Sequence, residues 1–274
     1  MNARRPGPSV RTRVREVLAD GVQLRERSRE DRVATEEPLE IRVTWPGATP
    51  TRLWVTMRTP GHDFELAAGF LLHEGVSGIR SVAYCTDEDL APEQEFNVVT
   101  VTLDQAPAAL PARSLGGLSA GSSACGVCGT DSIEAALAVR APRRSHQPPD
   151  LAIVRSLPAV LRDQQRVFER TGGLHAAGLF SATGEPWVVR EDIGRHNAVD
   201  KVTGARVLAG LDPAAPYLVV SGRAGFELVQ KAVAAGVGVL VAVGAPSSLA
   251  VDLARRSELG LIGFTSADRC VVYA

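Results

Sequence analysis

The last hundred residues constrain the fold more than any other part of the chain, because strand patterns alternate there with helical ones. Strand-like apolar runs lie at 217–220, 237–243 and 261–264, and helical patterns lie at 196–208, 224–235 and 248–257. Such alternation is typical of crossover units on a largely parallel sheet that is covered on both faces by helices. A hairpin over 176–181 and 187–190 is expected to precede these units, with a helix before it that ends near 172–173. We therefore expect an α/β fold with a three-layer α/β/α core in the C-terminal half.

The first 105 or so residues predict a smaller α+β module. Residues 39–43 and 52–57 alternate apolar and polar side chains, which indicates an antiparallel strand pair. A helix is expected from an N-cap at Asp63 to about Gly75, and strand patterns return at 79–84 and 96–103.

Four segments are expected along the chain. Residues 1–34 mix Arg, Glu, Asp, Pro and Gly without an apolar period, which predicts a flexible Arg-rich lead-in. The remaining segments are the α+β module at 35–110, a loop and helix that carry a C-x-x-C motif at 111–150, and an α/β cofactor-binding core at 151–274.

Composition excludes several classes of protein. The 274 residues are 45% hydrophobic and carry a formal net charge of −1, so there is no whole-chain basic field for nucleic acid. No apolar run is long enough for a membrane span, and no apolar segment follows the N-terminal arginines as a signal peptide requires. We expect a cytoplasmic protein without nucleic acid or membrane partners.

The most reactive segment contains Cys125 and Cys128, which lie just before a helix expected to begin at Thr130 or Asp131. A helix N-terminus stabilises a thiolate, and the adjacent glycines Gly126 and Gly129 leave the sulfur atoms accessible. Thiol chemistry with Cys125 as nucleophile is therefore the favoured interpretation.

Three alternatives to a sulfur-handling dithiol fit the sequence less well. A structural zinc site lacks a second C-x-x-C and would have to recruit histidines. A zinc deaminase needs an H-x-E motif and a Pro before the first cysteine, whereas Ala124 precedes Cys125. Thioredoxin-like exchange lacks its usual aromatic and proline context. We expect no structural metal.

Polar residues follow each of the three predicted core strands. Ser221 and Arg223 follow the first, residues 244–248 the second, and residues 265–269 the third. Because ligands of such folds bind beyond the carboxyl ends of the strands, these turns together favour an anionic or nucleotide ligand, although any one could be an ordinary turn.

Two further candidates lie before the predicted core helices. Asp192, Arg195 and Asn197 form a dense polar cluster with His196, and His175 follows two glycines that free the backbone to approach a ligand. Helix capping by Asp192 and Asn197, and a satisfied structural histidine, are the simpler explanations.

Several ordered blocks resemble the formate dehydrogenase accessory sulfurtransferase family. The blocks are GFLLHEG at 69–75, SACGVCG at 123–129, TGGLH at 171–175, REDIGRHNAVDK at 190–201 and SGR at 221–223. The resemblance covers roughly residues 30 to 272 and leaves out the Arg-rich lead-in.

This resemblance implies a sulfur carrier that accepts persulfide sulfur from a cysteine desulfurase. It would pass the sulfur to the molybdenum bis(molybdopterin guanine dinucleotide) cofactor before that cofactor enters formate dehydrogenase. Cys125 matches the persulfide-carrying cysteine. The family's cofactor-binding segment falls on Phe264, Thr265, Ser266, Ala267, Asp268 and Arg269. A homodimer and a cytidine deaminase-like fold without the zinc site are also implied.

Two functions remain open from the sequence. In the first, Cys125 carries the persulfide, Cys128 expels the sulfide, and Arg223 or Arg269 lies near a cofactor phosphate. In the second, the protein is a non-catalytic escort that holds the molybdenum cofactor and docks on formate dehydrogenase.

Overall fold

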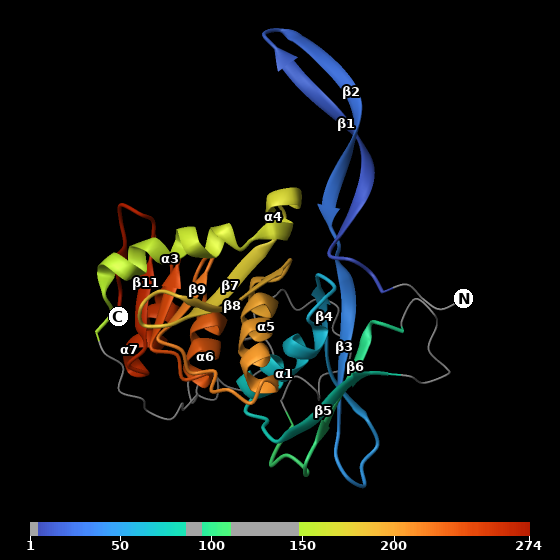
Figure 1. The fold of residues 1–274 in the computed structure, drawn as a ribbon, viewed down its shortest axis with the longest axis vertical. Coiled ribbons are helices and arrows are strands. Elements are labelled where there is room, and N and C mark those ends of the chain that lie inside the picture. Colours follow the sequence, from blue (N-terminus) through green and yellow to red (C-terminus); the bar gives the residue numbers. More distant parts are fainter. Residues whose placement is uncertain (1–4, 86–94, 111–147) are drawn as a thin grey trace.

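The structure is a computed structural model that describes residues 5–85, 95–110 and 148–274. Figure 1 shows three parts, a projecting two-stranded arm, a small sheet with one helix, and a larger α/β core. Both the expected C-terminal α/β fold and the smaller α+β module are present. Among the described residues, none of the helices combines the length and apolar character needed to cross a membrane.

The core is built on a six-stranded sheet with the order β12-β11-β10-β9-β7-β8. Its strands are β7 (His175–Phe180), β8 (Pro186–Asp192), β9 (Tyr217–Val220), β10 (Val239–Ala242), β11 (Gly260–Gly263) and β12 (Val271–Val272). Only β9, β10 and β11 run parallel, while β7, β8 and β12 pair antiparallel with their neighbours. The expected largely parallel sheet is therefore mixed, because the hairpin joins it in reverse and the chain end returns as β12.

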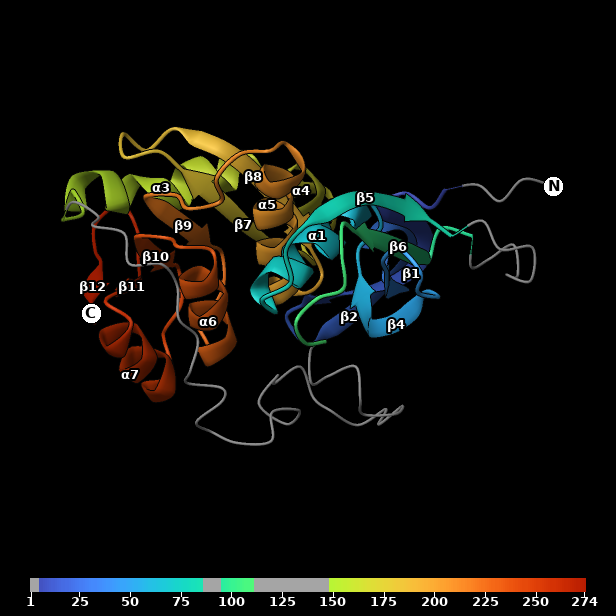
Figure 2. The same cartoon turned by 90° about the horizontal axis from the view of Figure 1, so that it is seen from below.

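Helices cover both faces of this sheet. They are α3 (Leu151–Asp163), α5 (Arg195–Leu208), α6 (Phe226–Ala234) and α7 (Ser248–Arg256). The short helix α4 (Arg166–Thr171) follows α3 and buries none of its residues. Figure 2 shows α3 on one side of the sheet and α6 and α7 on the other. The single helix expected before residue 172 is two helices, since the chain turns at Gln164 and Gln165.

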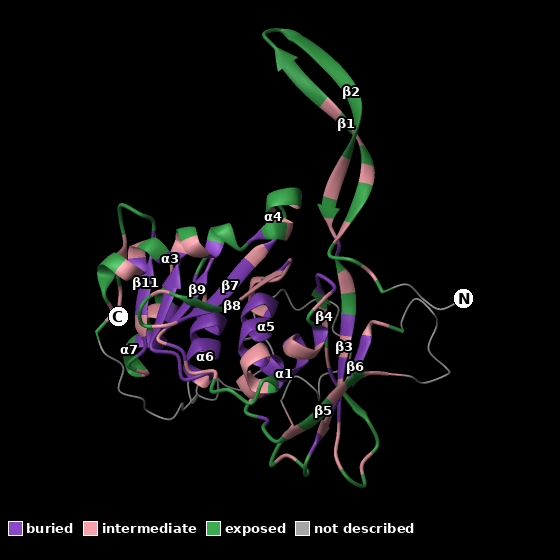
Figure 3. Ribbon diagram, in the orientation of Figure 1, coloured by how far each residue is buried: buried purple, intermediate pink, exposed green. Residues whose placement is uncertain are grey.

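The core packs in two layers, one on each face of the sheet, and Figure 3 shows the inner strands β7, β9, β10 and β11 as almost wholly buried. On one face, Leu157 and Leu161 of α3 pack against strand residues such as Val219. On the other, α5, α6 and α7 pack against the opposite side chains, including Leu218. Each fully buried leucine contributes about 1.5–3 kcal/mol of transfer free energy, so both faces hold the sheet in place.

The small module has a four-stranded sheet with the order β4-β3-β6-β5. Its elements are β3 (Glu37–Thr44), β4 (Thr51–Arg58), α1 (Asp63–His73), β5 (Ile79–Tyr84) and β6 (Val98–Leu103). The predicted antiparallel pair is confirmed as β3 and β4. The cap prediction is wrong, because His62 precedes the helix and the buried Asp63 carboxylate binds Arg58 instead.

Residues that were expected to form a flexible lead-in form the arm. Strands β1 (Ser9–Asp20) and β2 (Gln23–Ala34) pair antiparallel along their whole length and project from the body in Figure 1. Opposite charges face each other across the ribbon, as where Glu16 binds Arg27 and Arg29. Such cross-strand pairs stabilise a ribbon that has no apolar face. A search for hydrophobic periodicity cannot detect strands of this kind.

Candidate functional site

The topology of the core brings the predicted ligand-binding residues to one edge of the sheet. The carboxyl ends of the parallel strands β9, β10 and β11 lie there. Because β7 runs antiparallel to β9, with Ala177 opposite Val220, its first residue His175 lies beside Gly222 at the same edge. The last residue of β8, Asp192, pairs with His175. Segments far apart in sequence therefore form one strand-end edge, defined by residues 175, 192–197, 221–223, 244–247 and 264–269.

Backbone contacts join the loops of the strand-end edge. The Ser221 hydroxyl oxygen accepts a hydrogen bond from the Ala176 N–H at 2.9 Å. The Gly244 N–H donates to the Gly222 carbonyl oxygen at 2.9 Å. A β-carbon added to Gly222 would lie only 3.3 Å from Nδ1 of His175, so the imidazole lies close against this glycine.

The segment after β11 has an unusual local geometry. Phe264 has a φ of 49°, and its side chain is exposed. The Arg269 guanidinium lies 5.3 Å from the centre of the Phe264 ring, and the Ser266 N–H donates to the Arg269 carbonyl at 2.7 Å. Thr265, which follows Phe264 in the chain, is buried, and its hydroxyl has no hydrogen-bond partner among the described residues. A buried hydroxyl left unpaired is costly, which makes Thr265 a candidate for contact with a ligand.

The strand-end edge is rich in cationic side chains. The side chains of Arg195 and Arg223 make no ion pair or hydrogen bond within the described part of the chain, and the Arg269 guanidinium contacts the Phe264 ring there. Arg195 is also the first residue of α5, whose N-terminus has no side-chain cap. Free guanidinium groups beside an uncapped helix N-terminus form an arrangement suited to phosphate.

His175 is held in its neutral form at this edge. Partial burial lowers its pKa from 6.5, and the positive charges of Arg195 and His196 lower the pKa further, against a smaller opposite effect of Asp192. At neutral pH the imidazole can therefore both donate and accept a hydrogen bond.

Asp192 was a candidate ligand-binding residue from the sequence, but its carboxylate is enclosed by groups of the protein. It is fully buried, and four donors bind its carboxylate. Oδ1 accepts from the Gly194 N–H at 2.8 Å and from Asn197 Nδ2 at 3.1 Å. Oδ2 accepts from the Thr59 N–H at 3.2 Å and from Lys201 Nζ at 2.7 Å. The Asp192 carboxylate is thus occupied by the protein itself.

Asn197 likewise fastens the start of α5 to the small module. Its Nδ2 donates to the Met57 carbonyl at 2.8 Å, and its Oδ1 accepts from the Thr56 hydroxyl at 3.2 Å. Both partners belong to β4. With 7% of its surface exposed, Asn197 shares the structural role of Asp192.

Neighbouring charged residues of the 190–201 motif are also used for fastening. Arg190 forms a two-point ion pair with Glu65 of α1, at 2.6 and 2.8 Å. The Glu191 carboxylate accepts from the N–H groups of Val167 and Phe168 at the start of α4. Of the polar residues in this motif, Arg195 and His196 remain to form part of the strand-end edge.

Sequence reasoning missed several residues that support this edge. Glu227 of α6 lies 3.0 Å from Nε2 of His196, and Thr59 and Lys201 surround Asp192. The burial of these polar and charged side chains would have singled them out, but burial is known only from the three-dimensional structure.

Cys125 and Cys128 lie outside the described residues, so the structure does not place them relative to this edge. Among the described residues, no group of His, Cys, Asp and Glu is arranged to hold a metal ion.

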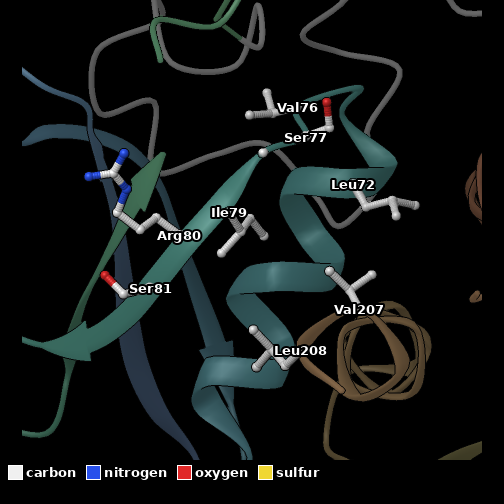
Figure 4. Close-up of a pocket in the computed structure, with 9 residues that line it drawn as sticks. Leu72, Val76, Ser77, Ile79, Arg80, Ser81, Val207 and Leu208 are labelled. Carbon is white, nitrogen blue, oxygen red and sulfur yellow. The ribbon is translucent and has the colours of Figure 1, made fainter. Parts of the chain in front are cut away.

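A separate hollow of about 220 Å³ opens between the end of α1, the start of β5 and the end of α5 (Figure 4). Its walls are partly apolar and partly polar and are formed by Leu72, Val76, Ser77, Gly78, Ile79, Arg80, Ser81, Val207 and Leu208. The hollow lies at the opposite end of α5 from Arg195. It is therefore not part of the strand-end edge.

Comparison with known proteins decides the family. The sequence profile of the FdhD/NarQ family matches residues 34–274. The chain belongs to the FdhD/NarQ family. A protein of Nocardia farcinica named sulfur carrier protein FdhD is 48% identical over 90% of this chain and 87% of its own length. A protein of the same name from Anaeromyxobacter dehalogenans is 45% identical over 99% of this chain and 94% of its own length.

The fold is similar to a crystal structure from Desulfotalea psychrophila, which carries the provisional name of a formate dehydrogenase accessory protein. The two superpose with a TM-score of 0.72 over 97% of this chain and 96% of that one, at 23% sequence identity. This likeness supports the mixed α/β fold. The more specific expectation of a cytidine deaminase-like arrangement stays a prediction.

Proposed function

We propose that this FdhD/NarQ family member is a sulfur carrier that accepts persulfide sulfur from a cysteine desulfurase. It delivers the sulfur to the molybdenum bis(molybdopterin guanine dinucleotide) cofactor, as substrate, before formate dehydrogenase receives that cofactor. The observation that carries the cofactor part is the strand-end edge, to which Arg195, Arg223 and Arg269 all belong and where Arg195 helps to keep His175 neutral. The names of the relatives support the sulfur part.

The cofactor binds at the strand-end edge through its guanine dinucleotide arms. The guanidinium groups of Arg195 and Arg223 hold the phosphates, and the unpaired Thr265 hydroxyl donates to an acceptor on the ligand. Ser221 and His175 supply further neutral donors beside Gly222. Asp192 and Asn197 take no direct part, because their polar atoms are bound within the protein.

Sulfur moves in two displacement steps. The Cys125 thiolate attacks the terminal sulfur of the desulfurase persulfide, so that a new S–S bond forms on Cys125 and the desulfurase cysteine leaves as thiolate. The Cys128 thiolate then attacks Cys125 Sγ, which forms a disulfide and expels hydrosulfide to molybdenum. A thiol reductant returns two electrons to the Cys125–Cys128 disulfide before the next cycle.

Mass spectrometry after incubation with desulfurase and cysteine tests the first step. Wild-type protein should gain the mass of one sulfur atom that a thiol reductant removes, and Cys125→Ser should gain none. Cys270→Ser, a half-buried cysteine of the core, is the matched control and should load normally. Undiminished loading of Cys125→Ser would refute the assignment of the nucleophile.

The alternative is a non-catalytic escort that holds the cofactor and docks on formate dehydrogenase. It is favoured by one observation, namely that the Arg195 and Arg223 side chains have no partner among the described residues, and such guanidinium groups need no thiol to bind phosphate. A Cys125→Ser, Cys128→Ser double variant separates the two functions. If it binds cofactor but leaves formate dehydrogenase inactive, the protein is a sulfur carrier; if it still activates the enzyme, the protein is an escort.

A further inference from the structure

We propose that Thr59, in the small module, is a positioning residue that orients Arg195 for the anionic ligand of the strand-end edge. The inference rests on the proposed function, because it concerns the same cofactor site. Its consequence is that the α/β core does not form a complete site without the connection between β4 and α1.

All three polar groups of Thr59 are directed at the segment that carries Arg195. The Thr59 hydroxyl accepts a hydrogen bond from the Ile193 N–H at 3.1 Å. Its own N–H donates to Asp192 Oδ2 at 3.2 Å, and its carbonyl oxygen accepts from Lys201 Nζ at 2.9 Å. Thr59 is 2% exposed, so water does not compete for these bonds.

The turn that receives these bonds leads directly into α5. Asp192 Oδ1 accepts from the Gly194 N–H, and Gly194 is the residue before the first helical residue, Arg195. The Thr59 hydroxyl therefore accepts the hydrogen bond of the Ile193 N–H, while the Asp192 carboxylate accepts that of the Gly194 N–H. Because Arg195 has no side-chain partner of its own in the described chain, the geometry of its guanidinium depends on this turn.

Thr59 is itself held by a rigid support. The preceding residue, Arg58, is fully buried and forms a two-point ion pair with Asp63, at 3.0 and 3.2 Å. The same guanidinium donates to the Phe96 carbonyl at 3.0 Å. The connection between β4 and α1 is thus fixed on both sides of Thr59, which allows it to act as a template for the turn.

The test measures binding of guanosine diphosphate, as a probe of the cofactor's nucleotide arms, by isothermal titration calorimetry. Thr59→Val removes the hydroxyl and keeps the side-chain shape and the backbone N–H. We expect it to weaken binding about tenfold, the effect of one lost hydrogen bond in a binding geometry. Thr59→Ser should restore affinity to within about twofold, because it restores the acceptor.

Thr51→Val is the matched control. It makes the same substitution in β4, the strand that precedes Thr59, where the Thr51 hydroxyl donates to the nearby Thr49 carbonyl, and it should bind as wild type. Thermal melts verify that each variant is folded. If Thr59→Val does not fold, Thr59→Ala, which cannot clash, takes its place in every comparison.

A double-variant cycle with Arg195→Gln distinguishes positioning from a general loss of structure. If Thr59 acts through Arg195, Thr59→Val should cost less than about twofold in the Arg195→Gln background. An equal loss in both backgrounds, or wild-type affinity of Thr59→Val, would overturn the positioning role alone. Absence of binding by the wild-type protein would refute the proposed cofactor site, and the positioning role with it.

Discussion

Gly204 of α5 packs so tightly against Gly69 of α1 that a β-carbon added to Gly204 would lie 2.6 Å from the Gly69 nitrogen. The same β-carbon would lie 1.8 Å from the Glu65 carbonyl oxygen, closer than any real contact of this kind. The two helices therefore meet backbone to backbone. This crossing joins the small module to the core and sets the distance between Thr59 and the turn before Arg195.

Gly204→Ala should destabilise the protein strongly. Because backbone atoms, which cannot rotate away, occupy the space of the new methyl group, the helices must separate, at a cost of about 3 kcal/mol or more. Urea unfolding followed by circular dichroism measures the change. Gly173→Ala is the control, since its β-carbon would meet only ordinary contacts of 3.7 Å or more. A Gly204→Ala variant as stable as wild type would show that α1 and α5 are not fixed at this crossing.

The ion pair between Glu65 and Arg190 should make stability depend on acid. Partial burial acts to raise the pKa of Glu65, but the hydrogen bond from Arg190 and the contact with His62 lower it more, to about 2. A folded pKa below the unfolded value of 4.5 contributes stability above pH 4.5, and this contribution is lost as pH falls from 4.5 toward 2. Because solvent screens the pair in part, we expect about 1–2 kcal/mol.

Glu65→Gln tests that contribution. The variant should lose stability at pH 7 and show a flatter decline between pH 4.5 and 2 than the wild type, as measured by urea unfolding at each pH. Glu185→Gln, in the exposed turn between β7 and β8, should leave the profile unchanged. A Glu65→Gln profile parallel to that of the wild type would count against a role for this ion pair in acid stability.

How far the sequence predicts the structure depends on the range of the interactions involved. Strands such as β9 and the α5 helix follow from local periodicity, and they appear close to their expected bounds. The arm does not, because its stability comes from cross-strand pairs such as Glu16 with Arg27, which depend on a register that no local pattern gives.

The candidate site shows the same division. Parallel strand ends were sufficient to predict that Ser221 and Thr265 lie at one edge. The roles of Asp192 and Asn197 were not predictable, because their partners in β4 and beyond lie well over a hundred residues away in sequence. A dense cluster of polar residues looks the same in the sequence whether it binds a ligand or packs against another module.

His73, Asp200 and Lys231 form a buried triad where α1, α5 and α6 meet. Asp200 Oδ1 lies 2.6 Å from both His73 Nδ1 and Lys231 Nζ. Burial lowers the pKa of His73, and the charge of Lys231 lowers it further, whereas Asp200 acts to raise it. A histidine with a lowered folded pKa costs stability as pH falls below its unfolded value of 6.5.

Lys231→Met should weaken this dependence of stability on pH. Without the lysine charge, Asp200 retains only His73 as a cationic partner, so the pKa of His73 should rise. Stability of the variant should then decline less than that of the wild type between pH 7.5 and pH 5.5. Histidine NMR titration gives the pKa, and Arg256→Met on α7 is a control for loss of a cation elsewhere. An unchanged His73 titration would exclude the proposed coupling to Lys231.

The arm should open independently of the rest of the protein. A two-stranded ribbon alone is at best marginally stable in water, and Val22 at its tip is completely exposed. Amide protons of β1 and β2 should therefore exchange with solvent on the order of a thousandfold faster than those of β9 and β10. Hydrogen exchange followed by mass spectrometry measures both regions in one sample.

Removal of the arm gives the second half of this prediction. Ser9 and Ala34 face each other at its base, so a Gly-Gly link between them can replace residues 10–33. The free energy of unfolding should change by less than about 1 kcal/mol, because the buried clusters of the core and of the small module contain no arm residue. Val22→Ser in the intact arm should likewise leave the free energy of unfolding unchanged. Slow exchange in β1, or a large loss of stability on removal, would instead mean that the arm is held by packing within the chain or by a second molecule.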